Sequence, residues 1–365
     1  MKRKIEIYML HPRVYDSDSL YRYLHIHHRE SLPYEFAWNE KDPDYFIASE
    51  HIWRNQTFWR KFLKIYHKAK INIYHAGECN APDLNIFDYA ICFDQHLSCD
   101  DRVCRTPTRL LFEDKVPDSV NSLGAGETTA RKELERKKEF CNYIYSNNRG
   151  HVKRTEIFYK INEYKKVDSL GKYLNNKTVP MKAKSEDGWG AVIRESIEIK
   201  RNYKFSIAFE NASYAGYTSE KILSSLAAHT IPIYWGNPFI AEELNERAFI
   251  NCHKYKDFDE VLEQIKLIDQ NDEMWCQMVS QPWLTLEQER REKEEIKKYY
   301  KFLENIFLQP IEYAHRKGEG AFPEIYRQSF FQSRKVLSIL KGDIYSCGRM
   351  CKKYLKILKE NARHK

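Results

Sequence analysis

The chain has 365 residues, of which 42% are hydrophobic and 14% aromatic. That length is typical of two domains, and that composition excludes wholesale disorder. The formal net charge of +8 belongs to the end of the chain, because residues 325–365 alone carry +9 and the rest about −1. A nucleic-acid-binding domain would carry a basic stripe across its fold, so no nucleic-acid partner is expected.

The nine cysteines form no CxxC pair, and their number is odd. They predict neither a disulfide framework nor a zinc site, and reduced thiols in a cytoplasmic protein are the simpler interpretation. The first residues, MKRKIEIYML, are basic, but the apolar run is short and interrupted by Glu6. This start predicts neither a signal peptide nor a membrane anchor. Apolar alternation at Ile5, Ile7 and Leu10 predicts a first β-strand instead.

Short apolar runs and amphipathic helices alternate along the first part of the chain. Strands are predicted over 44–49, 71–78 and 87–94, and a helix over 59–70. This alternation predicts a parallel sheet with helices on its faces. The charged segment 127–138 lacks an apolar face and is interpreted as the link between two domains or, equally, as a surface helix inside one lobe.

The same alternation resumes after this segment and predicts a second α/β lobe. The predicted strands are 140–146, 203–211 and 230–236, and the predicted helices are 155–164 and 219–229. A long charged helix follows over 287–307, with one apolar stripe that includes Ile296, Leu303 and Ile306.

The most informative stretch is YKFSIAFENASYAGYTSEKILSSLAAHTIPIYWGNP, residues 203–238, which predicts strand, polar turn, helix and strand. Ligands of open α/β sheets bind beyond the carboxyl ends of the strands. The polar residues expected to gather there are Glu210, Asn211, Tyr217, Glu220 and Lys221. A lysine in the first turn is unfavourable for a helix alone, but it suits a helix start that meets a phosphate.

Glu220 beside Lys221 also suits a sugar nucleotide. The carboxylate can accept hydrogen bonds from two ribose hydroxyls while the ammonium neutralises the pyrophosphate. From the spacing alone, an ordinary surface ion pair at a helix start is an equal alternative.

Residues 203–238 resemble the signature of the α-1,3/4-fucosyltransferases, glycosyltransferase family 10, in which a strand ending in FEN leads through Tyr-x-x-Glu-Lys into a helix. A second block, HAGECNAPDLNIFDYAICFD over 75–94 with DDRVCRTP over 100–107, resembles the first-lobe block of the bacterial members. In those members the Glu after the Gly is the proposed general base, a role that the resemblance gives to Glu78. The alternative is a solvated or turn-capping carboxylate.

In NNRGHVKRTEIFYKI, Arg154 resembles the family arginine that meets the donor phosphates. A guanidinium can hold two phosphate oxygens at once, although Lys153 and Arg149 are competitors for the role. Asn211 matches a family position near the phosphates and the sugar, and so does Tyr217. Either residue could instead stabilise the turn.

Trp189 lies where the family carries a glycine-rich loop, but the sequence departs from the family pattern there. Core packing is therefore the preferred interpretation of Trp189, and a contact with guanine is the alternative.

The resemblance implies the GT-B architecture, with two Rossmann-like lobes and a cleft between them. The expected domains are an N-terminal acceptor-binding lobe over 1–138, a C-terminal GDP-fucose-binding lobe over 139–310, and C-terminal helices with a basic amphipathic tail over 311–365. No GxGxxG, GxxxxGK[ST] or strand-end DxD motif is present. No metal ligand is assigned and no cofactor is required on this view, although stimulation by a divalent metal stays open.

The implied reaction is the inverting transfer of L-fucose from GDP-β-L-fucose to the GlcNAc of a Galβ1,4GlcNAc-type glycan acceptor, such as a lipopolysaccharide O-antigen. The alternatives are a GT-B transferase with another nucleotide sugar or acceptor, and a non-enzymatic membrane-associated binding protein. The basic amphipathic tail suits peripheral contact with the inner face of the cell membrane. Packing of the tail against the body is an equal alternative.

Overall fold

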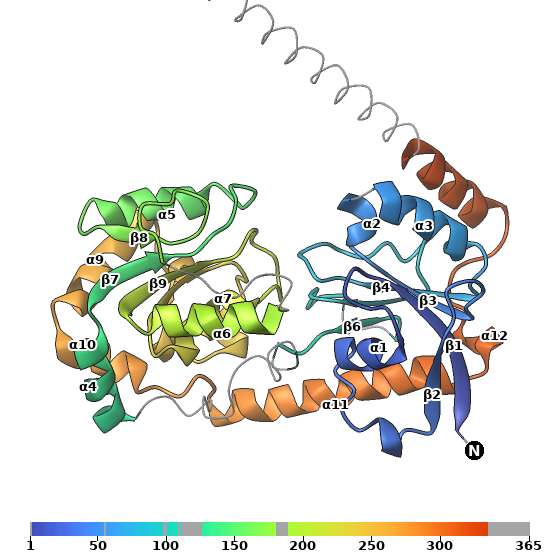
Figure 1. Ribbon diagram of the computed structural model, residues 1–365, viewed down its shortest axis with the longest axis horizontal. Helices are drawn as coiled ribbons and strands as arrows, with labels where there is room; N and C mark the ends of the chain where they lie inside the picture. The colour runs from blue at the N-terminus through green and yellow to red at the C-terminus, as the bar shows by residue number, and fades with distance from the viewer. Residues whose placement is uncertain are drawn as a thin grey trace, which may run out of the picture.

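The computed structural model describes residues 2–54, 56–97, 101–108, 110, 126–179 and 189–334. These residues form two lobes, each built on one parallel β-sheet with helices on both faces (Figure 1). The predicted α/β class, with one sheet in each of two lobes, is confirmed.

The first lobe contains a six-stranded sheet in the order β2-β1-β3-β4-β5-β6. Its strands are β1 (Arg3–Leu10), β2 (Tyr34–Trp38), β3 (Tyr45–Ser49), β4 (Ile71–His75), β5 (Tyr89–Cys92) and β6 (Val103–Arg105). Its helices are α1 (Ser17–Tyr23), α2 (His51–Arg54) and α3 (Gln56–Tyr66). The inner strands β3, β4 and β5 are buried along their whole length, as expected of parallel strands that are covered on both faces.

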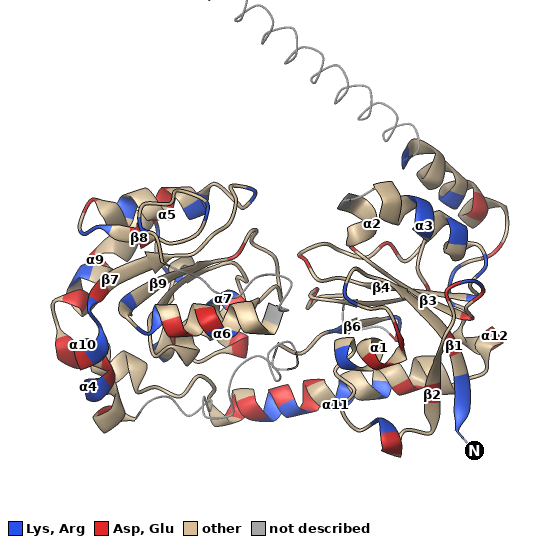
Figure 2. Cartoon of the chain, viewed as in Figure 1, with Lys and Arg blue, Asp and Glu red and all other residues tan. Residues whose placement is uncertain are grey.

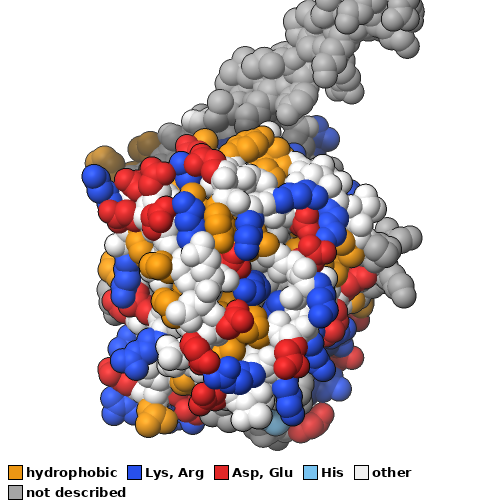
Figure 3. Space-filling model, turned by 90° about the vertical axis from the view of Figure 1, so that its left-hand side faces the viewer, with side chains coloured by type: hydrophobic (Ala, Val, Ile, Leu, Met, Phe, Trp, Pro, Cys, Tyr) orange, Lys and Arg blue, Asp and Glu red, His pale blue; other side chains and the backbone are white. Residues whose placement is uncertain are grey.

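The second lobe contains a five-stranded parallel sheet in the order β11-β10-β9-β7-β8. Its strands are β7 (Glu139–Tyr143), β8 (Val167–Ser169), β9 (Tyr203–Phe209), β10 (Ile231–Trp235) and β11 (Ile250–Asn251). Its helices are α4 (Glu127–Arg136), α5 (Lys153–Asn162), α6 (Trp189–Lys200), α7 (Glu220–Ala227), α8 (Ile240–Glu243), α9 (Phe258–Asp269) and α10 (Asp272–Val279). The outer face of this lobe interleaves acidic and basic side chains (Figure 3).

The strand order reverses once in each sheet, between β1 and β3 in the first lobe and between β7 and β9 in the second. At such a switch point the loops that follow the two strands diverge and leave a crevice at the carboxyl edge of the sheet. The sequence predicted strand 71–78, but β4 ends at His75. Gly77 and Glu78 therefore lie in the loop after the strand, at this edge.

Two helices lie near the predicted domain limits at 138 and 310. The charged segment 127–138 forms α4 and buries Ala130 in the core of the second lobe, which agrees with the alternative of a helix inside one lobe. The long helix α11 (Leu286–Leu308) runs from one lobe to the other (Figures 1 and 2). Near its start, the Gln288 amide donates to the Ala241 carbonyl in the second lobe at 2.8 Å.

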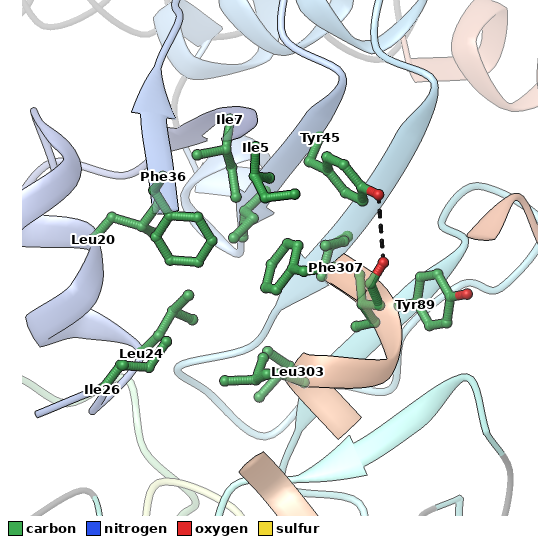
Figure 4. Close-up of a cluster of buried hydrophobic side chains, with 14 of the residues drawn as sticks. Ile5, Ile7, Leu20, Leu24, Ile26, Phe36, Tyr45, Tyr89, Leu303 and Phe307 are labelled. Carbon is green, nitrogen blue, oxygen red and sulfur yellow. Dashed lines mark hydrogen bonds between the residues drawn. The ribbon is translucent and has the colours of Figure 1, made fainter. Parts of the chain in front are cut away.

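The last turns of α11 pack into the first lobe. Phe307 lies among Ile5, Phe36 and Tyr45, and the Tyr45 hydroxyl donates to the Ile306 carbonyl at 3.4 Å (Figure 4). The apolar stripe predicted on this helix is real, but it completes the core of the first lobe and not that of the second. Burial of the stripe residues explains why a helix with so many charges on its solvent side is ordered.

After α12 (Ile311–Ala314), a helix over 321–334 packs on the α2 and α3 side of the first lobe. Phe331 contacts the ring of Tyr66 at a centroid distance of 5.1 Å. The predicted basic tail beyond Arg334 lies outside the described residues. Among the helices that the structure does describe, none is long and apolar enough to span a bilayer.

Candidate active site

The site is built where loops at the carboxyl edges of the two sheets meet. The loop 76–80 follows β4 in the first lobe, and Glu210 and Asn211 follow β9 in the second. The Asn211 carbonyl accepts a hydrogen bond from the His151 amide at 2.8 Å, which joins the loop after β9 to the loop after β7.

Glu78 lies directly against the second lobe. Its carboxylate oxygen Oε2 accepts hydrogen bonds from the Asn211 side-chain amide at 2.7 Å and from the Tyr217 hydroxyl at 3.2 Å. The neighbouring Cys79 thiol donates to the Asn211 Oδ1 at 3.4 Å. The structure thus brings together three of the predicted site residues, one from the first lobe and two from the second.

Tyr217 is held on its other side by the ring of Phe93, which it meets edge to face at 5.0 Å. Burial, together with the nearby carboxylates of Glu210 and Glu78, raises the pKa of Tyr217 well above its usual value. The hydroxyl therefore stays protonated and acts as a donor to Glu78.

Lys221 lies in the first turn of α7 and is paired with a buried carboxylate. Its ammonium lies 3.1 Å from Glu210 Oε2, 3.4 Å from Glu220 Oε1 and 2.8 Å from the Ser219 hydroxyl oxygen. Glu210 is fully buried and also accepts from the Ser219 amide at 2.8 Å. Ser219 is the N-cap of α7, but its side chain bonds to Glu210 and not to the first amides of the helix.

The pKa values of Lys221, Glu220 and Glu210 depend on one another. Burial alone would lower the pKa of Lys221, but the nearby Glu210 and Glu220 carboxylates outweigh it and raise that pKa. For Glu220 the effect of burial is outweighed by Lys221, so its pKa is lowered. For Glu210 burial prevails, and its pKa is raised despite Lys221. Lys221 is therefore cationic at neutral pH, and Glu210 fixes where that charge lies.

Lys200, at the end of α6, was not predicted as a site residue, because it belongs to none of the motifs. It is buried beneath α7 and donates to the Ser224 hydroxyl at 2.6 Å and the Lys221 carbonyl at 3.3 Å. Burial lowers its pKa to about 7. A titratable ammonium thus supports the first turns of the helix that presents Glu220 and Lys221.

Arg154 lies in the first turn of α5 and is buried, with its guanidinium over the ring of Tyr145 at 4.1 Å. One guanidinium nitrogen donates to the Phe209 carbonyl at 3.3 Å, immediately before Glu210. A Cβ at Gly150 would lie 2.5 Å from the guanidinium carbon, so a larger residue there would displace the Arg154 side chain.

The two competitors of Arg154 are placed differently. Lys153 is exposed, with its ammonium over the Trp235 ring at 5.3 Å, and Arg149 is also exposed. Of the three cations, Arg154 is the one that is buried and donates a hydrogen bond to the last residue of β9. The predicted role of Trp189 is untested, because its side chain lies outside the described residues.

A second interlobe contact lies beside the site and was not predicted. Arg105, at the end of β6, is buried and donates to the Gly216 carbonyl at 2.9 Å and to Glu243 at 2.6 Å. Gly216 needs its glycine because its φ is +82° and a Cβ would lie 2.2 Å from the Phe93 carbonyl. Arg105 therefore ties the turn before Tyr217 to the first lobe.

Three histidines and a tyrosine also gather at the carboxyl edge of the first sheet. The His11 ring lies 4.5 Å from Tyr23 and 4.9 Å from His51, and Tyr23 lies 4.9 Å from His75. Burial lowers the pKa of His11 to about 3 and that of His75 to about 4, so both rings are neutral. Within the described part of the chain, no group of three or more His, Cys, Asp or Glu side chains is placed to hold a metal ion.

Two parallel-sheet lobes whose strand ends face one another define the GT-B class of glycosyltransferase folds. Solved structures of α1,3-fucosyltransferase have this fold: one without a named ligand has a TM-score of 0.64 at 22% identity and covers 87% of this chain and 94% of its own. Another, with GDP-fucose, has a TM-score of 0.59 at 22% identity and covers 82% and 91%. The predicted GT-B architecture is confirmed.

Residues 134–305 match the model of glycosyltransferase family 10 (fucosyltransferase), C-terminal part. The chain is 29% identical over 251 residues to the α-(1,3)-fucosyltransferase FucT of Helicobacter pylori, a match that covers 60% of this chain and 48% of that protein. It is 24% identical over 223 residues to GDP-fucose protein O-fucosyltransferase 3 of Homo sapiens, covering 60% and 43%. Residues 134–305 are thus similar to the C-terminal part of glycosyltransferase family 10, the family whose signature the sequence motifs resemble.

The matched region spans only about half or less of the length of these curated relatives.

Proposed function

We propose that the protein is an inverting α-1,3-fucosyltransferase that moves L-fucose from GDP-β-L-fucose to a sugar hydroxyl, with Glu78 as the general base. The observation that carries the proposal is the position of the Glu78 carboxylate, 2.7 Å from the Asn211 amide across the two lobes. A base on the acceptor side that reaches the residues after β9 has the layout that a single displacement requires.

In this displacement the acceptor oxygen attacks the anomeric carbon of fucose as the bond from that carbon to the GDP oxygen breaks. GDP leaves with the bonding electron pair, and the Glu78 carboxylate takes the acceptor proton. Glu78 accepts from Asn211 and from the protonated Tyr217. These two donors orient the carboxylate.

The second lobe supplies the groups for the donor. Lys221 and Arg154 offer positive charge to the diphosphate, which accumulates negative charge as GDP departs. Glu220, whose carboxylate is ionised beside Lys221, accepts hydrogen bonds from the ribose hydroxyls. This assignment of protein groups to the diphosphate and the ribose is consistent with a reaction that requires no cofactor. Assays with added Mg²⁺ or with EDTA test stimulation by a divalent metal.

For the acceptor we favour the GlcNAc of a Galβ1,4GlcNAc-type glycan, as in a lipopolysaccharide O-antigen, because the family motifs of the first lobe resemble the bacterial members. The relatives named GDP-fucose protein O-fucosyltransferase 3 support a second candidate, a protein acceptor. A screen with N-acetyllactosamine and with Ser- and Thr-containing peptides decides between the two. Formation of the α-1,3 linkage is checked by NMR of the product.

The proposed location is cytoplasmic, with peripheral contact at the inner face of the membrane through the basic tail. Flotation with anionic and neutral vesicles tests this part, and equal recovery with both vesicle types would contradict it.

The test of the donor is calorimetric titration with GDP, GDP-fucose, UDP and ADP. Selective binding of GDP and GDP-fucose is expected. A preference for UDP or ADP would favour a GT-B transferase with another nucleotide sugar. Absence of binding by all four would favour a non-enzymatic binding protein.

A further inference from the structure

The loop 76–80, which carries Glu78, is fixed at several points from within the first lobe. The Ala76 amide donates to the Ile91 carbonyl at 2.8 Å, and the Gly77 amide donates to Glu50 Oε2 at 2.9 Å. At the other end, the Asn80 side-chain amide donates to the Tyr74 hydroxyl at 2.6 Å. The Asn80 backbone amide closes the turn on the Glu78 carbonyl at 2.8 Å.

Tyr74 is the member of this set that reaches furthest into the lobe. It lies on β4, is 1% exposed, and packs its ring against Phe87 at 5.1 Å. Its hydroxyl accepts a second hydrogen bond, from the Trp53 indole nitrogen at 3.1 Å. One oxygen atom therefore connects the Glu78 loop to Trp53 on α2.

Trp53 is in turn covered by the helix over 321–334. The Phe330 ring meets the Trp53 ring edge to face at 6.0 Å, and the Arg334 guanidinium lies over it at 4.7 Å. A continuous series of contacts thus runs from the C-terminal helix through Trp53 and Tyr74 to Asn80.

We propose that Tyr74 is a positioning residue for Glu78, and that docking of the C-terminal helix on Trp53 contributes to that position. The proposal rests on the proposed function, because Glu78 is the base in that reaction. Tyr74 itself touches no reacting atom. It fixes the end of the loop opposite to the Gly77 amide, so that the carboxylate is placed from both sides.

The contribution to turnover follows from the demands of proton transfer. A general base must lie within hydrogen-bond reach of the proton it removes. A displacement of about 1 Å in such a group can cost about 100-fold in rate. Without its hydrogen bond to Tyr74, Asn80 no longer fixes the loop, whereas Lys221 and Glu220 are held by ion pairs within the other lobe.

The first test compares two buried tyrosines of the same lobe. Tyr74→Phe removes the hydroxyl and keeps the ring. The matched control is Tyr66→Phe, because the Tyr66 hydroxyl donates to the Ile86 carbonyl at 2.8 Å and its ring also contacts the C-terminal helix. Both variants should lose thermal stability, but only Tyr74→Phe should lower kcat, by about 10- to 100-fold, with the KM for GDP-fucose unchanged.

Asn80→Ala should lower kcat by the same factor as Tyr74→Phe. The double variant should turn over no more slowly than Tyr74→Phe, because both changes remove the same hydrogen bond between Asn80 and Tyr74. A normal kcat in Tyr74→Phe, or an equal loss in Tyr66→Phe, would overturn the positioning role.

A second measurement does not depend on fucosyl transfer. Cys79 lies in the same loop, and alkylation of its thiol by iodoacetamide, followed by peptide mass spectrometry, reports how often the loop opens. Tyr74→Phe should accelerate alkylation of Cys79 and Tyr66→Phe should not. An unchanged rate would refute the proposal. If the wild-type protein transfers no fucose but Tyr74→Phe still accelerates alkylation of Cys79, the proposed function is refuted. The role of Tyr74 in positioning the loop then stands.

The part played by the C-terminal helix is tested on the full chain. Phe330→Ala removes the ring that packs on Trp53, and Phe322→Ala is the matched control on the same helix, since Phe322 is 86% exposed. Phe330→Ala should accelerate alkylation of Cys79 and lower kcat, and Phe322→Ala should change neither. If Phe330→Ala and Phe322→Ala behaved alike, docking of this helix on Trp53 would play no part in positioning Glu78.

Discussion

Lys221 offers a sharp test of the donor site, because its substitution has a predictable effect on both stability and binding. In Lys221→Met the fully buried Glu210 loses the cation that lies 3.1 Å away, while Glu220 remains close. Removing one partner of a buried ion pair costs about 3–5 kcal/mol. The Lys221 side chain is 22% exposed and Ser219 still donates to Glu210, so we expect the lower end, about 3 kcal/mol.

The pH dependence separates this cause from a simple packing loss. In the variant the pKa of Glu210 is raised further above its unfolded value, because burial is no longer opposed by Lys221. A carboxyl with a raised folded pKa destabilises the protein above its unfolded pKa, and the penalty disappears as pH falls toward that value. The deficit in unfolding free energy should therefore shrink between pH 7 and pH 5.

Urea unfolding at several pH values and calorimetry with GDP are the two assays. The second substitution Glu210→Gln should restore most of the stability of Lys221→Met, because the uncompensated charge is gone. GDP affinity should stay reduced by about 10- to 100-fold in the double variant, since a charged hydrogen-bond donor is missing. A deficit that neither pH nor Glu210→Gln reduces would refute the ion-pair argument.

Three further predictions follow from other parts of the site. Glu78→Gln should lower kcat by about 100- to 10,000-fold while the Kd for GDP stays unchanged, because the amide keeps the shape and loses the base; a kcat within a few-fold of wild type would contradict the assignment. Lys200, whose pKa is lowered to about 7, should add up to ~1.4 kcal/mol per pH unit to the unfolding free energy as pH rises from 7 to 9, and Lys200→Met should remove this slope in urea titrations. Arg105→Met removes the cation beside Glu243, which keeps its hydrogen bonds from Thr108 and Asn237, and should cost about 3 kcal/mol in the same assay, with no effect if the contact between the lobes is incidental.

Much of the fold could be predicted because most strands are recognisable from their local sequence. The apolar runs that became β3, β5, β9 and β10 are continuous and bounded by polar residues, as buried parallel strands are. Helices α9 and α10 were not predicted, although their caps Asp257 and Asn271 each precede an amphipathic segment. Those two helices were readable from the sequence.

The assignment of helices to lobes could not be predicted in the same way. Segment 127–138 has almost no apolar content, and the burial of Ala130 depends on a partner surface that is distant in sequence. The apolar stripe of α11 was predicted, but a stripe does not say which core it completes. Only the three-dimensional packing shows that Phe307 belongs with Ile5 and Phe36.

For the candidate site, motifs identified residues but not the bonds that position them. Glu220 and Lys221 were singled out by their place at a helix start, whereas the carboxylate that orients Lys221 comes from Glu210 at the end of a strand. The contact of Glu78 with Asn211 joins residues 133 positions apart, and no local pattern encodes it. The motifs therefore identify the chemical groups of the site. The packing of the two lobes determines which of these groups bond to one another.

The residues proposed for the donor and the proposed base Glu78 are held in place by different contacts. Lys221 and Glu220 are held by bonds within the second lobe, so donor binding should survive changes in the first lobe. Glu78 is held by its own loop and also by Asn211 and Tyr217 across the lobes. Any change that alters the approach of the lobes should then reach turnover before it reaches affinity for the nucleotide, because Glu78 bonds across the lobes whereas Lys221 and Glu220 are held within one.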